Sequence, residues 1–177
     1  MAEKIRLDII ALQDFIAQYK ATFNEHRLGA DNEIYKWKAV KCFQDNWDIE
    51  AEDFFSMVKA SLAQTYNLLA SQNNFPARMI EEFSKAAPDE MRSMFKELFD
   101  ESIDLTRRVT YFEKRSVELR QIKPEVWKSH YQTPNAISTY LWLRYPDKYY
   151  SYKYSVIKEI TPKNFAELIC PPGSMIA

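Results

Sequence analysis

The chain of 177 residues contains only two glycines, Gly29 and Gly173. Tight hairpin turns usually need positive φ angles, which glycine adopts at the lowest cost. Phosphate-binding loops and dinucleotide fingerprints need several glycines, because the backbone must approach the phosphates closely. The scarcity therefore excludes both nucleotide-binding motifs. It also argues against a β-sandwich or barrel, and it favours helices joined by polar and proline-containing loops.

Apolar residues recur at steps of three and four along the first 122 residues, which is the spacing of amphipathic helices. The pattern predicts a helix from Ile5 to about Leu28, a second over residues 34–43, and a third that begins at an N-cap, Asp48, and ends at the polar run 71–74. Two short helices should follow, with Pro76 and Pro88 in their first turns, and a last helix over residues 102–121. We therefore expect a helical bundle or array over residues 1–122.

Prolines divide the part of the chain that follows. They recur every 10 to 16 residues from position 124 to position 162, so no element there can be long. A helix fits residues 136–145. Residues 147–157 fit either a strand, with alternate tyrosines on one face, or a helix that stacks them. Tyrosine and valine favour strands, and we prefer the strand.

The composition is that of one globular domain, with 46% hydrophobic and 28% charged residues. We expect a mainly α fold, a multi-helix array with a small irregular or short-strand C-terminal segment. Its parts would be the array over 1–122, an aromatic-basic segment over 123–163 that packs on the array within the same domain, and a tail over 164–177.

The first residues of the sequence indicate the cellular compartment of the protein. They mix charges into every turn, unlike a secretory signal, and no apolar run approaches the roughly 20 residues that span a membrane. The two cysteines, Cys42 and Cys170, lie far apart in the sequence. We expect a cytoplasmic protein with free thiols and no membrane partner.

No catalytic or metal-binding pattern can be assembled from the chain. The four candidate soft ligands do not share a spacing typical of metal sites; they are His26, Cys42, His130 and Cys170. No serine stands in a glycine-flanked nucleophile elbow. Paired carboxylates fall near helix ends or on polar faces, where helices normally carry acids. We expect no enzyme activity, no metal and no cofactor.

Residues Pro134 to Ile160 hold six of the eleven tyrosines and one of the four tryptophans. Between Lys123 and Lys163 there are seven basic and three acidic residues, a balance of +4, while residues 1–122 carry −4. Rings can stack on bases and cations can contact phosphates. The segment therefore predicts a nucleic-acid-binding site with five residues: Arg144, Lys148, Tyr150, Tyr152 and Lys153.

The alternative for any one ring is a place in the core, with its hydroxyl at the surface. We assign the other three tryptophans, Trp37, Trp47 and Trp127, to packing.

Four stretches of the chain resemble the N-terminal region of bacterial McrB-like AAA+ proteins. They are YKWKAVKCFQDNWDIEAEDF (35–54), TYNLLASQNNFPARMIEEF (65–83), MFKELFDESIDLTRRVTYF (94–112) and NAISTYLWLRYPDKYYSYKYS (135–155). The resemblance implies a modified-DNA-recognition part of a restriction system active in phage defence. It also implies two partners, a downstream AAA+ GTPase module and a separate nuclease subunit. The phosphate loop of that module is absent here, so the chain would be the recognition part alone.

The N-terminal domains of that family vary in fold, so the resemblance transfers no base-pocket residues. A second hypothesis therefore stays open. The chain could be a helical protein-interaction or assembly module, since tyrosine and tryptophan are also enriched in protein interfaces.

Overall fold

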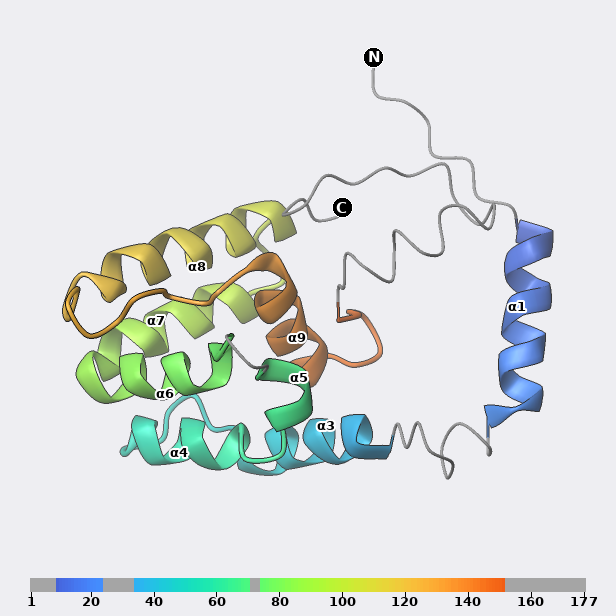
Figure 1. Ribbon diagram of the computed structural model, residues 1–177, viewed down its shortest axis with the longest axis horizontal. Coiled ribbons are helices and arrows are strands. Elements are labelled where there is room, and N and C mark those ends of the chain that lie inside the picture. Colours follow the sequence, from blue (N-terminus) through green and yellow to red (C-terminus); the bar gives the residue numbers. More distant parts are fainter. Residues whose placement is uncertain (1–8, 24–33, 71–73, 152–177) are drawn as a thin grey trace, which may run out of the picture. The chain divides into compact units, whose positions relative to one another are not determined.

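The computed structural model describes residues 9–23, 34–70 and 74–151. The chain divides into two compact units, residues 1–34 with 153–176, and residues 35–152. In the described residues the regular elements are helices, without a strand, so the expected mainly α fold is confirmed (Figure 1). No described helix is both long and apolar enough to cross a membrane.

The first unit contains α1 (Ile9–Ala21), which has no buried residue. Its predicted ends, near Ile5 and Leu28, lie outside the described residues. The helices of the second unit are α3 (Ile34–Asn46), α4 (Phe54–Ser61), α5 (Tyr66–Leu69), α6 (Pro76–Ala86), α7 (Pro88–Phe99), α8 (Leu105–Arg120) and α9 (Pro134–Arg144). Within it, α7 packs against α6, α8 and α9.

Prolines and capping side chains set where several helices begin. Pro76 and Pro88 occupy the first turns of α6 and α7, as predicted. The N–H groups of a first turn have no partner within the helix, so proline, which lacks an N–H, is tolerated there. Asp104 caps α8 by accepting from the N–H of Arg107 at 3.1 Å. Thr133 caps α9. These starts follow from local hydrogen bonding.

The predicted N-cap at Asp48 is wrong. Asp53 caps α4 and accepts from the N–H of Ser56 at 3.0 Å, whereas Asp48 accepts from the N–H of Glu50 within a turn. The predicted long helix is also interrupted between α4 and α5. There the Thr65 hydroxyl donates to the Leu62 carbonyl at 2.7 Å. Both aspartates precede apolar residues at helical spacing, and packing selects between them.

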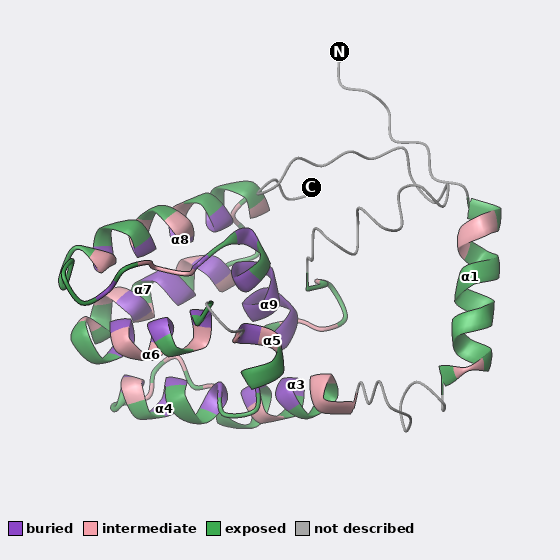
Figure 2. Ribbon diagram, in the orientation of Figure 1, coloured by how far each residue is buried: buried purple, intermediate pink, exposed green. Residues whose placement is uncertain are grey.

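The core of the second unit is rich in aromatic rings, and α9 is buried along almost its whole length (purple in Figure 2). Every α9 residue from Ala136 to Leu143 is buried. Tyr140 is fully buried and donates to Gln132 Oε1 at 2.8 Å, which satisfies its hydroxyl. Its ring centroid lies 5.8 Å from that of Phe95 and 6.1 Å from that of Phe112. α9 is therefore an interior helix, and the hydroxyls of Ser138 and Thr139 are satisfied by the carbonyl of Asn135.

After α9 in the sequence, residues 146–148 form a turn and residues 149–151 are irregular. The remainder of the predicted strand over 147–157 lies outside the described residues. The predicted division of the chain at residues 122 and 163 stays a prediction. The first boundary falls within the second compact unit, and the second boundary is not described.

Candidate nucleic-acid interface

The predicted binding residues that the structure describes lie at the C-terminal end of α9 and just beyond it. Arg144 is the last residue of α9 and is exposed, Lys148 ends the turn, and Tyr150 is 80% exposed. Tyr152 and Lys153 lie outside the described residues. The segment thus places one exposed arginine and one exposed ring within seven residues of each other.

Arg144 borders a pocket of about 340 Å³. Its guanidinium carbon lies 5.3 Å from the centroid of the Tyr145 ring. Among the described residues, the Arg144 side chain has no hydrogen-bond or ion-pair partner. A cation that is positioned by a ring yet not neutralised can interact with a ligand anion.

Aromatic rings from two segments line this pocket. Trp47 follows α3, and Phe95 and Phe99 come from α7. The Trp47 centroid lies 4.8 Å from that of Phe95 and 5.5 Å from that of Phe99, both at T-shaped angles. Phe43 stacks on Trp47 at 4.7 Å and 15°. The rings therefore hold one another in place, in the edge-to-face and stacked arrangements that aromatic pairs prefer.

A second contact holds the loop that carries Trp47. Arg92 of α7 donates to the carbonyl oxygens of Ile49 and Ala51, the latter at 2.8 Å. Its guanidinium carbon also lies 4.7 Å from the centroid of the Phe54 ring. The loop is thereby tied to α7 at several points, so the pocket wall is formed before any ligand arrives.

The other charges around the pocket are already engaged within the protein. Lys96 pairs with Glu50 at 2.7 Å. Asp100 accepts from the side chain and backbone of Ser102 at 2.6 and 3.0 Å, and these hydrogen bonds lower the pKa of the Asp100 carboxyl. Asp48 accepts from a backbone N–H in its turn. Among the described charged residues of this pocket, Arg144 remains the one without a polar partner.

Lys148 has a different environment from Arg144. Its Nζ lies 2.6 Å from Oε2 of Glu101, and this hydrogen bond raises the pKa of Lys148 and lowers that of Glu101. The Tyr149 hydroxyl donates to Oε1 of Glu101 at 3.2 Å and accepts from Nη2 of Arg108 at 2.9 Å. Lys148 therefore holds the turn against the end of α7, and its role in contacting phosphate stays a prediction.

Most described rings of the aromatic-basic segment belong to the fold. Tyr140 and Trp142 are buried, and Tyr145 and Tyr149 are half-buried with bonded hydroxyls. Tyr150 is the exposed ring among the described tyrosines of this segment. The core interpretation thus holds for these four rings, whose neighbours come from α3, α7 and α8.

The packing prediction for the other tryptophans holds for Trp127, which is 5% exposed, and for Trp47 in the ring cluster. It is wrong for Trp37, which is 55% exposed. Trp37 lies in the first turn of α3, where the ring of Trp142 contacts it with centroids 6.2 Å apart. One neighbouring ring covers only part of an indole.

The residues that line the Arg144 pocket were not predicted from the sequence. Phe95 and Phe99 have the i, i+4 spacing that indicates a buried helix face, and this spacing alone does not reveal that Trp47 leaves a hollow beside them. Among the described residues, no group of three or more His, Cys, Asp or Glu side chains could hold a metal ion.

No family model matches this chain, and no curated protein or solved structure matches it either. A function for the chain therefore has to be argued from its own residues and from the resemblance of the four stretches.

Proposed function

We propose that the compact unit over residues 35–152 recognises nucleic acid and is a binding module rather than an enzyme. The observation that carries the proposal is the position of Arg144, an exposed cation without a polar partner among the described residues, at the edge of an aromatic pocket. A base would enter the pocket and the adjacent phosphate would contact Arg144.

The pocket has the chemistry for an unstacked base. Its volume of about 340 Å³ is sufficient for a small planar ligand, and its lining includes the rings of Trp47, Phe95 and Phe99 beside four charged residues. Stacking of a base on an aromatic side chain contributes roughly 1–3 kcal/mol. A base that leaves its duplex costs a few kcal/mol, so a pre-formed pocket and a nearby cation together are needed to offset that cost.

The acids near the pocket limit how much backbone can bind there. Asp48 and Asp100 line it and Glu101 lies next in sequence, so a second phosphate would meet repulsion close to Arg144. We therefore expect a shallow salt dependence, because each phosphate contact contributes a slope of about −0.9 in log affinity against log salt.

The identity of the ligand comes from the resemblance to McrB-like proteins. It favours DNA that carries a modified base, within a bacterial restriction system for phage defence. A downstream AAA+ GTPase module and a nuclease subunit would be the partners, in the cytoplasm. These assignments are part of the proposal and rest on the four sequence stretches.

The test is a fluorescence-anisotropy titration of the full chain with labelled DNA. Unmodified, methylated and hydroxymethylated duplexes and a single strand would each be titrated at two ionic strengths. Arg144→Ala should weaken binding about tenfold and make the salt slope shallower by about one unit. Arg78→Ala, an exposed arginine on α6, is the matched control and should leave binding unchanged. Absence of binding at low salt, or equal affinity in Arg144→Ala, would disprove the proposal.

A second candidate is a protein-interaction or assembly module, which the exposed rings of Trp37 and Tyr150 favour. An indole that is half exposed on a helix is a common anchor of protein interfaces. Light scattering of the full chain tests this candidate. It predicts a stable dimer that Trp37→Ala dissociates, together with no DNA binding at low salt.

A further inference from the structure

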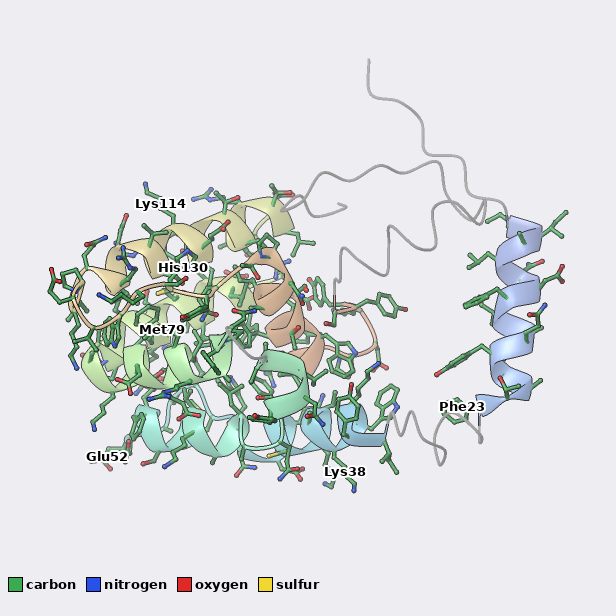
Figure 3. The ribbon with its side chains drawn as sticks, in the orientation of Figure 1. Phe23, Lys38, Glu52, Met79, Lys114 and His130 are labelled. Atoms are coloured by element: carbon green, nitrogen blue, oxygen red, sulfur yellow. The ribbon has the colours of Figure 1, made fainter. Side chains whose placement is uncertain are left out.

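A second hollow, of about 240 Å³, lies between the start of α6 and the loop over residues 124–131. Its apolar lining comes from Phe75, Met79, Trp127 and Tyr131 (Figure 3 labels Met79). None of its lining residues borders the Arg144 pocket. We call this hollow the Tyr131 groove.

The loop is held in a strained conformation that presents Tyr131. The φ angle of Tyr131 is 55°, and it is the one non-glycine residue with positive φ in the part of the chain that the structure describes. Such a conformation costs on the order of 1–3 kcal/mol and persists where the surroundings enforce it, often at binding sites.

Gln132 is the residue that enforces it. Its side chain is fully buried, and its Nε2 donates to the carbonyl of Pro76 at 3.0 Å. Its Oε1 accepts from the Tyr140 hydroxyl, and its backbone N–H donates to Nδ1 of His130 at 3.1 Å. These bonds tie the loop to α6 and to the core, so Tyr131 is fixed beside Phe75, with ring centroids 6.1 Å apart.

Apolar side chains continue from the groove onto the surface. Val126 is 70% exposed, Phe75 is 37% exposed, and Ile122, just before the loop, is 49% exposed. Below them Trp127 is buried and meets the ring of Phe83 edge-on at 5.1 Å. A rigid apolar hollow next to exposed aliphatic groups is typical of protein docking sites.

The charge around the groove favours an acidic partner. Arg78, Lys123 and Lys128 are exposed, and no ion pair holds any of them within the described residues. Lys123 Nζ lies 5.2 Å from the centroid of the Trp127 ring. Among the charged residues that line the groove, the two cations Arg78 and Lys128 accompany one acid, Glu82.

We propose that the Tyr131 groove docks a short acidic peptide segment of a protein partner, which inserts one large apolar side chain beside Phe75 and Tyr131. Carboxylates that flank this side chain would contact Arg78 and Lys128. The inference goes beyond the proposed nucleic-acid recognition and does not depend on it.

The geometry favours a peptide over a nucleic acid. The aliphatic groups of Met79 and Val126 suit an apolar side chain better than a base edge.

The experiment selects, from a displayed library of random 12-residue peptides, those that bind the full chain. The affinity of one enriched peptide is then measured by fluorescence anisotropy. We expect enriched peptides with one Leu, Ile, Phe or Trp flanked by Asp or Glu. Val126→Glu and Arg78→Glu alter exposed side chains and should each weaken that peptide at least tenfold, whereas Arg144→Ala, the matched control, should not.

Three results would overturn the proposal. They are no enrichment over an unrelated protein, enrichment of peptides without acids, and unchanged affinity in both groove variants. A single-stranded oligonucleotide whose binding is lost in Arg78→Glu but retained in Arg144→Ala would assign the groove to nucleic acid instead. The proposed function fails by a different result, namely DNA affinity that is unaffected by Arg144→Ala.

Discussion

Two adjacent stretches of the aromatic-basic segment, residues 134–143 and 144–151, both contain tyrosines but lie in opposite environments. Residues 134–143 of α9 are mostly buried, and their polar groups are satisfied inside the protein. Residues 144–151 lie at the surface, where charged side chains and tyrosine hydroxyls form contacts with the ends of α7 and α8. A cluster of tyrosines in a sequence thus combines a structural part with a surface part, and burial separates them.

The strongest test of this comparison replaces the buried ring. Tyr140→Ala should lower the free energy of unfolding by about 3–5 kcal/mol, because it leaves a cavity among Phe95 and Phe112. Urea denaturation of the full chain measures it. Tyr150→Ala is the matched control and should change stability by less than about 0.5 kcal/mol, since its ring is exposed. Similar losses in the two variants would contradict the division.

An intermediate effect is expected at the boundary between the two parts. Arg108 is 3% exposed and donates to the Leu98 carbonyl at 2.9 Å and to the Tyr149 hydroxyl at 2.9 Å. Arg108→Ala should lower stability by about 2–3 kcal/mol, because it removes charge-assisted hydrogen bonds and leaves the carbonyl unsatisfied. Its Nε has no partner within the described residues, so Arg108→Met should cost less than Arg108→Ala. A loss of stability in Arg108→Met that equals or exceeds the loss in Arg108→Ala would contradict this expectation.

The smallest effect is expected at the ion pair of Glu101 and Lys148. The pKa of Glu101 is lowered by the hydrogen bond from Lys148, so the pair stabilises the fold above the ordinary Glu pKa of 4.5. The contribution is lost as the pH falls through the lower pKa of the folded state. Glu101→Gln should therefore cause a small loss of stability at pH 7 that disappears at low pH. A loss that grows on acidification would contradict the assignment.

The local part of this fold could be predicted from the sequence. The helical spacing and the positions of Pro76 and Pro88 are properties of neighbouring residues, and they predicted helices at α6, α7 and α8. The helix predicted from Asp48 onward is instead divided into α4 and α5. Asp48 and Asp53 show the limit of local signals. Both are plausible caps before the same apolar face, and only the packed loop, tied to Arg92, determines that Asp53 begins α4.

By itself, the sequence determined that the fold is mainly helical and that six of the eleven tyrosines lie between Pro134 and Ile160, where basic residues outnumber acidic ones. Only the tertiary structure decided that Arg144 stays without an ion-pair partner among the described residues while Lys148 is held by Glu101, 47 residues away in sequence. It also decided that Trp47 meets Phe95 and Phe99 around a hollow. The physical reason is distance along the chain. Helix propensity acts within a few residues, whereas burial and charge pairing depend on segments that meet only when the helices pack.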